Sequence, residues 1–372
     1  MSLKKKIIIT GALGFIGRHL ITHCFKDYQI LAIDKREPDE GLKKESSVFQ
    51  FYNVDLGNAQ SLQRFWKKIE PFHQDVEGII HLAAYYDFSN KPHPNYVRLQ
   101  MGLQTLLSLM EKDLPKSCSF ISSSSMASLK STSPGVALSE NSQRSLAWEY
   151  PKSKVFNEAI IDNFKTDKVI IHLILAAIYS DFCELVPLYQ SIELLKSKKI
   201  QSFFYPGPLK RGLTYLHLTD TGRAFEDALT FSKEAKTRAM ALQNKKSIYR
   251  FLIGEERPFT YEDIHRKVTL HFNKKVKLLF RVPKFLAKLG YCLLWPLNLF
   301  QKRPSFIKLW MIPFSGEHYE FDLECSKKAL NWKPQKLIHE EFPKILDKAK
   351  RNEEKWHELN KKRPWKRASI KS

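Results

Sequence analysis

The chain has 372 residues, enough for a large hydrophobic core and about two domains. Its hydrophobic share of 43% and charged share of 27% are typical of a soluble globular protein. A net charge of +22 leaves three partners open: nucleic acid, a membrane surface or an anionic small molecule, besides a merely lysine-rich surface. The cysteines are odd in number and lack metal-ligand spacing, so we expect reduced thiols, no metal site and a cytoplasmic location: Cys24, Cys118, Cys183, Cys292 and Cys325.

The first recognisable element is a strand that runs into a glycine turn. Ile7–Thr10 is apolar and β-branched, and Gly11, Gly14 and Gly17 follow at a Gly-x-x-Gly-x-x-Gly spacing that opens into a helix. Because Gly11 ends the apolar run, we interpret Met1–Thr10 as a strand and not as a signal peptide. Glycines let a pyrophosphate approach the backbone, and a helix N-terminus offers free N–H groups. The turn predicts a phosphate cradle, although glycines after a strand also serve ordinary turns.

A second strand, Tyr28–Asp34, ends in an acid 23 residues after Gly11. A dinucleotide-binding fold places a carboxylate near this distance, on the ribose hydroxyls of the adenosine. A carboxylate repels a 2′-phosphate, so Asp34 favours NAD. Lys35 and Arg36 follow directly and would attract a phosphate, which leaves NADP as the alternative.

Strand and helix patterns then alternate along the chain. This alternation predicts an α/β fold: a doubly wound parallel Rossmann sheet with a smaller, mostly helical C-terminal substrate domain. The predicted strands are Val48–Leu56, Val76–Ala84, Cys118–Ser125, Val169–Ile178 and Arg250–Ile253, and the predicted helices are Ser61–Ile69, Asn95–Met110, Lys152–Phe164, Leu185–Ser197, Thr219–Phe231 and Leu337–Leu359.

We assign residues 1–180 and about 213–255 to the dinucleotide-binding domain, 181–212 and 256–350 to the substrate domain, and 351–372 to a basic C-terminal tail. The most apolar stretch, Phe285–Phe300, is shorter than the roughly 20 residues that span a bilayer. It is interpreted as a buried helix, with a greasy substrate entrance or an interfacial membrane helix as alternatives.

Tyr150 and Lys154 stand four residues apart, on one face of the expected helix. A nearby ammonium stabilises a phenolate and lowers the pKa of the tyrosine, which suits it to acid–base work. The serine run Ser122–Ser125, at the end of the preceding strand, is the expected source of a hydroxyl that holds the substrate oxygen. A lone Tyr-x-x-x-Lys is a weak signal, and its order after the glycine turn, the acid and the serines gives it weight.

These motifs together resemble the extended short-chain dehydrogenase/reductase superfamily, in its NAD-dependent epimerase/dehydratase branch. The resemblance covers residues 4 to about 350 and is specific for the superfamily but not for a substrate. It rests on Thr10–Gly17, Asp34, Asp55-Leu56, His81–Ala84, Ser122-Ser123, Tyr150–Lys154 with Glu158, Tyr215–Asp220 and Lys328–Pro334.

The resemblance implies roles for individual residues. Tyr150 would be the acid/base, Lys154 would bind the nicotinamide ribose and tune Tyr150, and Ser123 would hold the substrate oxygen, with Ser124 as the alternative. Substrate phosphates would meet Lys210 and Arg211, whose other interpretation is loop solvation. The cofactor would be contacted by Gly11, Gly14, Phe15, Ile16, Gly17, Asp34, Asp55, Leu56, Ala83, Ala84, Tyr150 and Lys154.

The chain departs from the family pattern at four positions. Leu99 stands where the family often has Asn, and Ile174 and Leu175 replace an Arg-Pro pair. Leu213 stands where nucleotide-sugar enzymes often carry an arginine, which weakens the case for a diphosphate substrate.

Three functions therefore stay open: an epimerase or dehydratase of a nucleotide sugar, an oxidoreductase of a lipid-like or steroid-like alcohol or ketone near the membrane, and a non-catalytic NAD-binding sensor. The second resembles the 3β-hydroxysteroid dehydrogenase branch, which also carries an apolar stretch before its C-terminal signature. We expect a small-molecule substrate and no nucleic-acid partner. A peripheral membrane contact stays open, and so does a homodimer, which rests on analogy with relatives.

Overall fold

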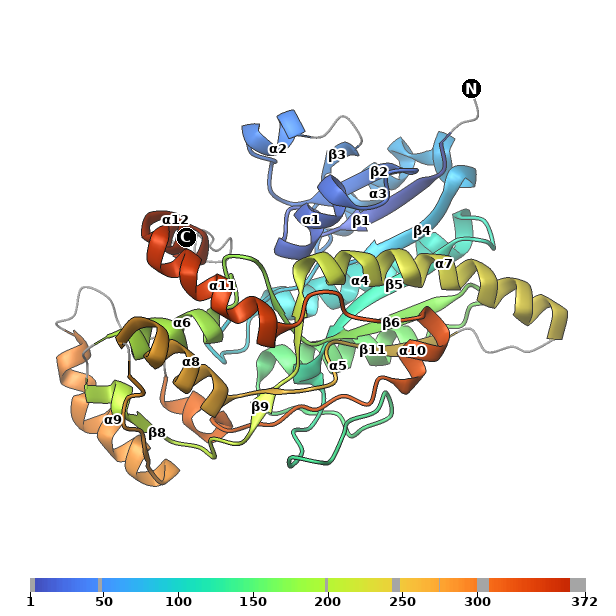
Figure 1. Cartoon of the computed structure of the whole chain (residues 1–372). Coiled ribbons are helices and arrows are strands. Elements are labelled where there is room, and N and C mark those ends of the chain that lie inside the picture. The colour runs from blue at the N-terminus through green and yellow to red at the C-terminus, as the bar shows by residue number, and fades with distance from the viewer. Residues whose placement is uncertain are drawn as a thin grey trace.

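The computed structural model describes residues 4–45, 49–197, 200–242, 248–273, 275–299 and 308–361. A seven-stranded sheet lies at its centre in the order β11-β6-β5-β4-β1-β2-β3 (Figure 1). Every neighbouring pair is parallel, which confirms the predicted doubly wound sheet. The strands are β1 (Lys6–Thr10), β2 (Gln29–Asp34), β3 (Phe49–Asn53), β4 (Val76–His81), β5 (Ser119–Ser125), β6 (Ile170–Leu175) and β11 (Ile248–Ile253).

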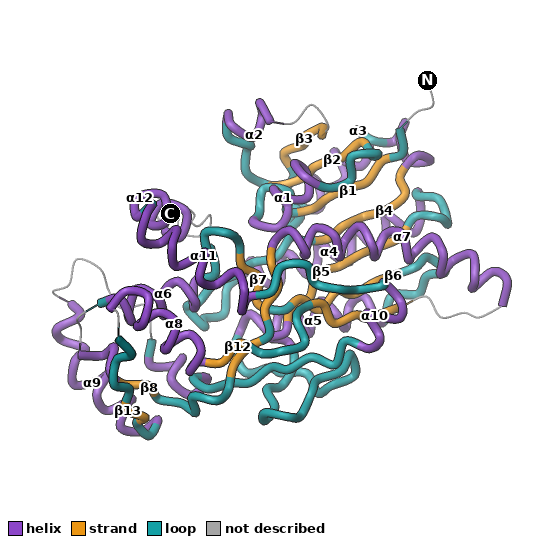
Figure 2. The backbone as a smooth tube through the Cα atoms, in the orientation of Figure 1, coloured by secondary structure: helices purple, strands orange, loops and turns teal. Residues whose placement is uncertain are grey.

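Helices cover both faces of this sheet (Figure 2). Alternate residues of β1 show why: Ile7 and Ile9 belong to one buried apolar cluster and Ile8 to another, since neighbouring side chains of a strand point to opposite faces. On the first face lie α1 (Phe15–His23), α7 (Leu218–Leu242) and α10 (Glu324–Leu330); on the second lie α3 (Ala59–Lys68), α4 (Pro94–Asp113) and α5 (Glu149–Asp162).

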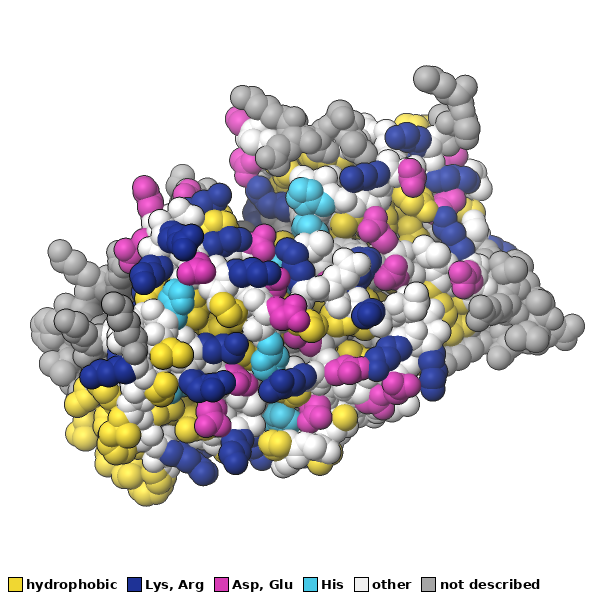
Figure 3. All heavy atoms as spheres, in the orientation of Figure 1, with side chains coloured by type: hydrophobic (Ala, Val, Ile, Leu, Met, Phe, Trp, Pro, Cys, Tyr) yellow, Lys and Arg dark blue, Asp and Glu magenta, His cyan; other side chains and the backbone are white. Residues whose placement is uncertain are grey.

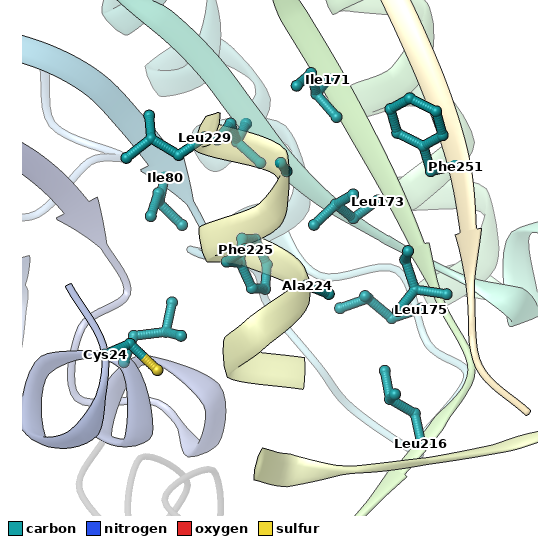
Figure 4. Close-up of a cluster of buried hydrophobic side chains, with 14 of the residues drawn as sticks. Cys24, Ile80, Ile171, Leu173, Leu175, Leu216, Ala224, Phe225, Leu229 and Phe251 are labelled. Carbon is teal, nitrogen blue, oxygen red and sulfur yellow. The ribbon is translucent and has the colours of Figure 1, made fainter. Parts of the chain in front are cut away.

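Helix α7 is the main cover of the first face. Figure 4 shows Phe225 and Leu229 of α7 among Ile80 of β4 and Leu173 of β6. Ala224 lies on the same side of the helix and is fully buried. Packing of this kind stabilises the sheet by about 1.5–3 kcal/mol for each large apolar side chain removed from water.

The smaller part of the molecule is mostly helical, as predicted. Its core is a third cluster in which α6 packs on α8 and α11. Its helices are α6 (Val186–Lys196), α8 (Tyr261–Asn273), α9 (Lys284–Leu299), α11 (Ile338–Arg351) and α12 (Glu353–Lys361), and its short strand pairs are β13 (Phe280–Arg281) with β8 (Phe204–Tyr205) and β12 (Phe259–Thr260) with β9 (Gly212–Leu213). The pair β7 (Ala177–Tyr179) and β10 (Tyr215–His217) lies beside the main sheet, and α2 (Glu40–Glu45) follows β2.

The remaining turns of helix are of the 3₁₀ type. They are η1 (Glu70–Asp75), η2 (Met126–Ser128), η3 (Ile200–Phe203) and η4 (Leu309–Phe314). In the part of the chain that the structure describes, no helix is both long and apolar enough to cross a membrane.

The segment assigned to a basic tail from residue 351 begins as part of the fold. Its first residues form α12, and Trp356 on this helix is fully buried. The Trp356 Nε1 donates to Glu193 Oε1 at 3.0 Å, and its ring lies 5.6 Å from that of Tyr189. The buried Trp356 side chain therefore anchors the strongly charged helix α12 to α6. Residues 362–372 of the predicted tail, and Phe300 at the end of the apolar stretch, lie outside the described residues.

We predict that Trp356→Ala lowers the free energy of unfolding by about 3–5 kcal/mol, because it leaves a cavity and removes the hydrogen bond to Glu193. Urea denaturation followed by circular dichroism measures this loss. Lys355→Ala, on the same helix, should change it by less than about 0.5 kcal/mol. Equal stability of Trp356→Ala and the wild type would mean that α12 is not part of the folded unit.

Candidate functional site

The predicted site residues follow the carboxyl ends of neighbouring strands. Gly11 follows β1, Asp34 ends β2, Asp55 stands two residues after β3, and Ala83 two residues after β4. Ser123 lies at the end of β5, and α5 carries both Tyr150 and Lys154. Carboxyl ends of parallel strands meet at one edge of a sheet, which is where doubly wound folds bind their ligands.

Two glycines of the turn stand where no side chain fits. Gly11 has a φ of +68°, and a Cβ there would lie 2.8 Å from the backbone nitrogen of Ala83. A Cβ on Gly17 would lie 2.5 Å from the carbonyl oxygen of Gly11. The backbone turn is therefore compact, and it opens α1 with Gly14 as an N-cap that has no side chain to occupy the first N–H groups. This is the cradle expected for a pyrophosphate.

A hydroxyl fastens this turn to the end of β4. Thr10 Oγ1 accepts the backbone N–H groups of Leu82 and Ala83, both at 3.2 Å. Its own proton is then free for His81 Nδ1, 3.0 Å away. Burial lowers the pKa of His81 to about 3, with the nearby Lys154 charge adding to the effect, so the ring is neutral and accepts this bond. His81 is therefore a packed strand histidine.

Asp34 is only 7% exposed and makes two kinds of contact. Its Oδ2 accepts the backbone N–H of Leu13 at 3.0 Å, which holds the glycine turn. Arg36 donates its Nε to Oδ1 and one terminal nitrogen to Oδ2, each at 3.1 Å. The sequence placed Asp34 and Arg36 as competitors for a ligand, and the structure joins them as an ion pair.

The loop after β3 is also ordered by a carboxylate. Asp55 Oδ1 accepts the N–H of Gly57 at 2.9 Å, and Arg98 donates to Asp55 Oδ2 at 3.1 Å. Leu56 beside it is buried, whereas Ala84 is exposed and Ala83 half-buried. Phe15 and Ile16, in the first turn of α1, are half-buried.

The Lys154 side chain is hydrogen-bonded to the backbone near the end of β5. Its Nζ donates to the carbonyl oxygen of Ser123 at 2.9 Å, and Ser123 Oγ donates to the carbonyl oxygen of His81 at 3.3 Å. Burial lowers the pKa of Lys154 to about 8, and the Glu158 carboxylate opposes this shift. Lys154 Nζ lies 5.9 Å from the centre of the Tyr150 ring.

Tyr150 differs from expectation in its acidity. Burial raises the pKa of Tyr150 to about 12, and a hydrogen bond with the Ser125 side chain opposes the rise. The predicted lowering by Lys154 is not among the causes of this shift, and desolvation of the phenolate sets its direction. Without ligands, Tyr150 is therefore a neutral phenol that can donate a proton.

Alternate residues of the serine run Ser122–Ser125 face different neighbours. Ser122 and Ser124 are buried, whereas Ser123 and Ser125 are half-buried, as the two-residue period of a strand requires. Ser124 gives its hydroxyl to the buried Glu158, so the alternative substrate serine is turned away from Tyr150. Ser125 takes its place beside the phenol; strand alternation counted from Ser123 is the signal that would have found it.

Glu158 is the buried anchor of this second set of contacts. Arg144 Nε donates to Glu158 Oε2 at 2.8 Å, and the Ser128 hydroxyl donates to Oε1 at 3.2 Å. Arg144 also donates to the carbonyl oxygens of Glu140 and Ser142. The loop before α5 is thus pinned to the helix that carries Tyr150 and Lys154.

Aromatic rings surround Tyr150. The Tyr86 ring packs edge-on at 4.5 Å, and that of Trp148 lies at 5.6 Å. Trp148 also contacts Phe88 at 5.9 Å and Trp310 of η4 at 5.3 Å. We call these four rings the aromatic wall. Its members come from three distant parts of the chain, so the sequence did not reveal it.

Two open clefts, of about 560 and 500 Å³, share Arg211, Lys284 and Gly316 in their linings. The larger is bounded by residues 143–147, which lead directly into Trp148 and Tyr150. Arg211 donates to the Gly316 carbonyl and the Ser133 hydroxyl, two uncharged acceptors, so its charge is not neutralised by them. Lys210 is exposed and lines neither cleft.

The four departures from the family pattern are packed side chains. Leu99 is half-buried against the second core cluster, and Ile174 and Leu175 are buried in β6. Leu213 is half-buried in β9. Among the described residues, no group of three or more His, Cys, Asp or Glu side chains could hold a metal ion.

Solved structures of similar fold cover nearly the whole chain. A dTDP-glucose 4,6-dehydratase from Bacillus anthracis, in complex with NAD, has a TM-score of 0.64 at 18% identity and covers 95% of this chain and 99% of its own. A UDP-glucose 4-epimerase from Thermotoga maritima, with UDP-glucose, has a TM-score of 0.64 at 16% identity and covers 94% and 100%. At these identities the likeness shows the fold.

Curated relatives match shorter parts. A dTDP-D-glucose 4,6-dehydratase of Dictyostelium discoideum is 32% identical over 94 residues, 23% of this chain and 20% of its own length. An uncharacterized epimerase/dehydratase of Staphylococcus saprophyticus is 31% identical over 137 residues, 36% of this chain and 40% of its own length. The chain thus spans less than half the length of these two relatives.

The model of the NAD dependent epimerase/dehydratase family matches residues 7–239, well over half of the chain. This stretch holds every residue of the glycine turn, the Asp34 carboxylate and the Ser123, Tyr150 and Lys154 set described above. The predicted family, its enzyme class and NAD as its cofactor are thereby confirmed, and the chain belongs to the NAD dependent epimerase/dehydratase family.

Proposed function

We propose that this protein is an NAD-dependent epimerase or dehydratase that acts on a nucleotide sugar. The observation that carries the proposal is the larger cleft, whose lining residues 143–147 lead into Trp148 and Tyr150. Its lining includes Lys130, Arg211 and Lys284 against a single acid, Glu317, while Arg144, also in the lining, is paired with Glu158. Burial raises the pKa of Glu317 to about 7, so even this acid is partly neutral at physiological pH. A cleft of this charge suits a diphosphate.

The residues present fit NAD. The compact turn at Gly11 and Gly17 and the uncapped start of α1 suit its pyrophosphate, and Asp34 at the end of β2 suits the adenosine ribose. Arg36 already occupies part of the Asp34 carboxylate and would have to share it with the ribose hydroxyls. When bound, NAD supplies the acceptor and donor of a hydride.

Tyr150 is the proposed acid/base. Its buried phenol holds a proton at neutral pH, and the Lys154 ammonium stabilises the phenolate once that proton has left. Ser125 contacts the phenol, and Ser123 stands two residues before it on the same side of β5. Either hydroxyl can hold the substrate oxygen against Tyr150.

Arg211 is the proposed diphosphate ligand. It stands two residues before Leu213, the position at which relatives often carry an arginine. A guanidinium presents a rigid fork of donors that matches phosphate oxygens. Lys284 also lines both clefts and adds a second positive charge.

A second candidate function is favoured by the aromatic wall. The Tyr86 and Trp148 rings contact Tyr150, and the Phe88 and Trp310 rings contact Trp148. A lipid-like alcohol or ketone would bury its apolar body there. The same assay decides between the two substrates.

We predict turnover of at least one member of a nucleotide-sugar panel that contains UDP-glucose, UDP-glucuronic acid, UDP-N-acetylglucosamine and dTDP-glucose. Mass spectrometry and chromatography detect an epimer, or a product lighter by one water. Tyr150→Phe should lower the rate by about 10²–10⁴-fold while NAD still binds, because only the proton donor is lost.

The control is Tyr249→Phe, a conservative change on β11. Turnover of long-chain secondary alcohols and of no nucleotide sugar would replace the first function by the second. NAD binding without turnover of either class would leave a cofactor-binding sensor.

We predict that NADH-driven reduction of a 4-keto nucleotide sugar slows above about pH 8. The pKa of Lys154 is lowered to about 8, so its ammonium is present below that pH and lost above it. Tyr150 stays protonated until about pH 12, so its own titration contributes nothing in this range. Without the ammonium, the phenol is a weaker acid.

The pH profile of kcat/KM measures this effect. Lys154→Met should remove the falling limb and lower the rate by about 10²-fold or more, whereas Lys152→Met, half a turn away on α5, should keep both. Persistence of the limb in Lys154→Met would assign it to another group.

We predict that Arg211→Ala raises the KM for the nucleotide sugar by about tenfold or more with little change in kcat, since the diphosphate does not react. Lys210→Ala is the matched control, because Lys210 carries the neighbouring positive charge but lines neither cleft. Equal effects of the two changes on KM would show a general field and no specific contact.

A further inference from the structure

One side of α9 is apolar and exposed. Phe285, Leu286, Leu289 and Leu293 are 69%, 45%, 55% and 70% exposed. At spacings of one, four and eight residues they lie on one side of the helix, within an arc of about 100°. Folding normally buries such an amphipathic face, and here the described residues leave it open to solvent.

The neighbouring strands extend this apolar side. Phe204 of β8 and Phe280 of β13 are 43% and 49% exposed, with ring centres 5.9 Å apart, and Leu278 is 64% exposed. Together with the four α9 residues they form what we call the α9 surface. Figure 3 shows hydrophobic side chains gathered at the lower left, where Figure 1 places α9 and β8.

The stretch of sequence that contains α9 carries charge of one sign. No Asp or Glu occurs between Asp263 and Glu317, a stretch that contains the whole of α9. Helix positions advance by about 100° per residue, so Lys288 and Lys284 lie just beyond the edge of the apolar arc that Phe285 marks. The same stretch holds eleven basic residues: Arg266, Lys267, Lys274, Lys275, Lys277, Arg281, Lys284, Lys288, Lys302, Arg303 and Lys308.

We propose that the α9 surface binds an anionic phospholipid bilayer, with α9 lying in the plane of the interface. Apolar side chains of such a helix enter the boundary between headgroups and acyl chains, and a basic edge meets the lipid phosphates. A second copy of this chain fits less well, since it would bring the same positive charges together. The described helices include none that spans a membrane, so the contact is peripheral.

This contact would orient the basic clefts. Arg281, Val282, Pro283 and Lys284 line the smaller cleft, and the apolar residues of α9 begin at the next position. The mouth of that cleft therefore lies beside the membrane-bound surface. The proposal does not depend on the substrate, because it concerns a surface and no reacting group.

Co-sedimentation with vesicles tests the proposal on the full-length protein. Vesicles of phosphatidylcholine alone are compared with vesicles containing about one third phosphatidylglycerol, at low and high salt. We expect binding to the anionic vesicles that weakens with salt, and little binding to the neutral ones. Absence of binding to anionic vesicles at low salt would overturn the proposal.

Three variants locate the contact. The combined change Phe285→Ser, Leu289→Ser and Leu293→Ser should weaken binding at least about tenfold, and Lys288→Glu should weaken it at low salt. Val136→Ser is the control, an exposed apolar residue in the loop after β5. Because all five positions are exposed, NAD affinity and circular dichroism should match those of the wild type.

Two results would contradict this assignment. Unchanged vesicle binding by the triple serine variant would place the lipid contact elsewhere. Light scattering after gel filtration supplies the other: a wild-type oligomer that the triple variant dissociates would show that a second copy covers the α9 surface.

Discussion

The close approach of the glycine turn to the end of β4 is the contact on which the site depends. Gly11 leaves no room for a Cβ against Ala83, and Thr10 takes the N–H groups of Leu82 and Ala83. From there a chain of contacts runs through the His81 carbonyl to Ser123, and through the Ser123 carbonyl to Lys154. The glycine turn, Ser123 and Lys154 are thus connected along one edge of the sheet.

Burial governs the chemistry at this edge. It raises the pKa of Tyr150 and lowers those of Lys154 and His81, so it favours the neutral form of each group. Glu158 is the counterweight: it opposes the shift of Lys154 and is itself held by Arg144 and Ser128. In the protein alone, Glu158 is thus the group that favours the charged form of Lys154.

The fold was largely readable from the sequence because its signals are local. The residues of a buried strand such as Ile170–Leu175 are consecutive in the chain, and the glycines after β1 are also close together in sequence. Hydrophobic period and glycine spacing therefore suffice to predict these elements. Ser125 shows an intermediate case: strand alternation predicts its side, yet a resemblance pointed to Ser123 and Ser124.

Other features depend on contacts between distant segments, which periodicity does not report. Trp148 meets Trp310 across 162 positions, and Arg211 meets Gly316 across 105. The burial of Trp356 likewise needs α6. The predicted helix Leu337–Leu359 already covers most of α12, but the packing of that helix on α6 is not visible in the sequence. Asp34 and Arg36 are close in sequence, but Asp34 alone suggested NAD and Arg36 alone suggested NADP. Only the structure shows that the two side chains form an ion pair.

Rapid mixing can detect the proposed hydride transfer at the edge of the sheet as it happens. NAD-loaded protein is mixed with a turned-over nucleotide sugar, unlabelled or deuterated at the oxidised carbon, and absorbance at 340 nm is followed. We expect a transient NADH signal that forms more slowly with deuterium and is lost in Tyr150→Phe. Product formation with no NADH signal and no isotope effect would contradict it.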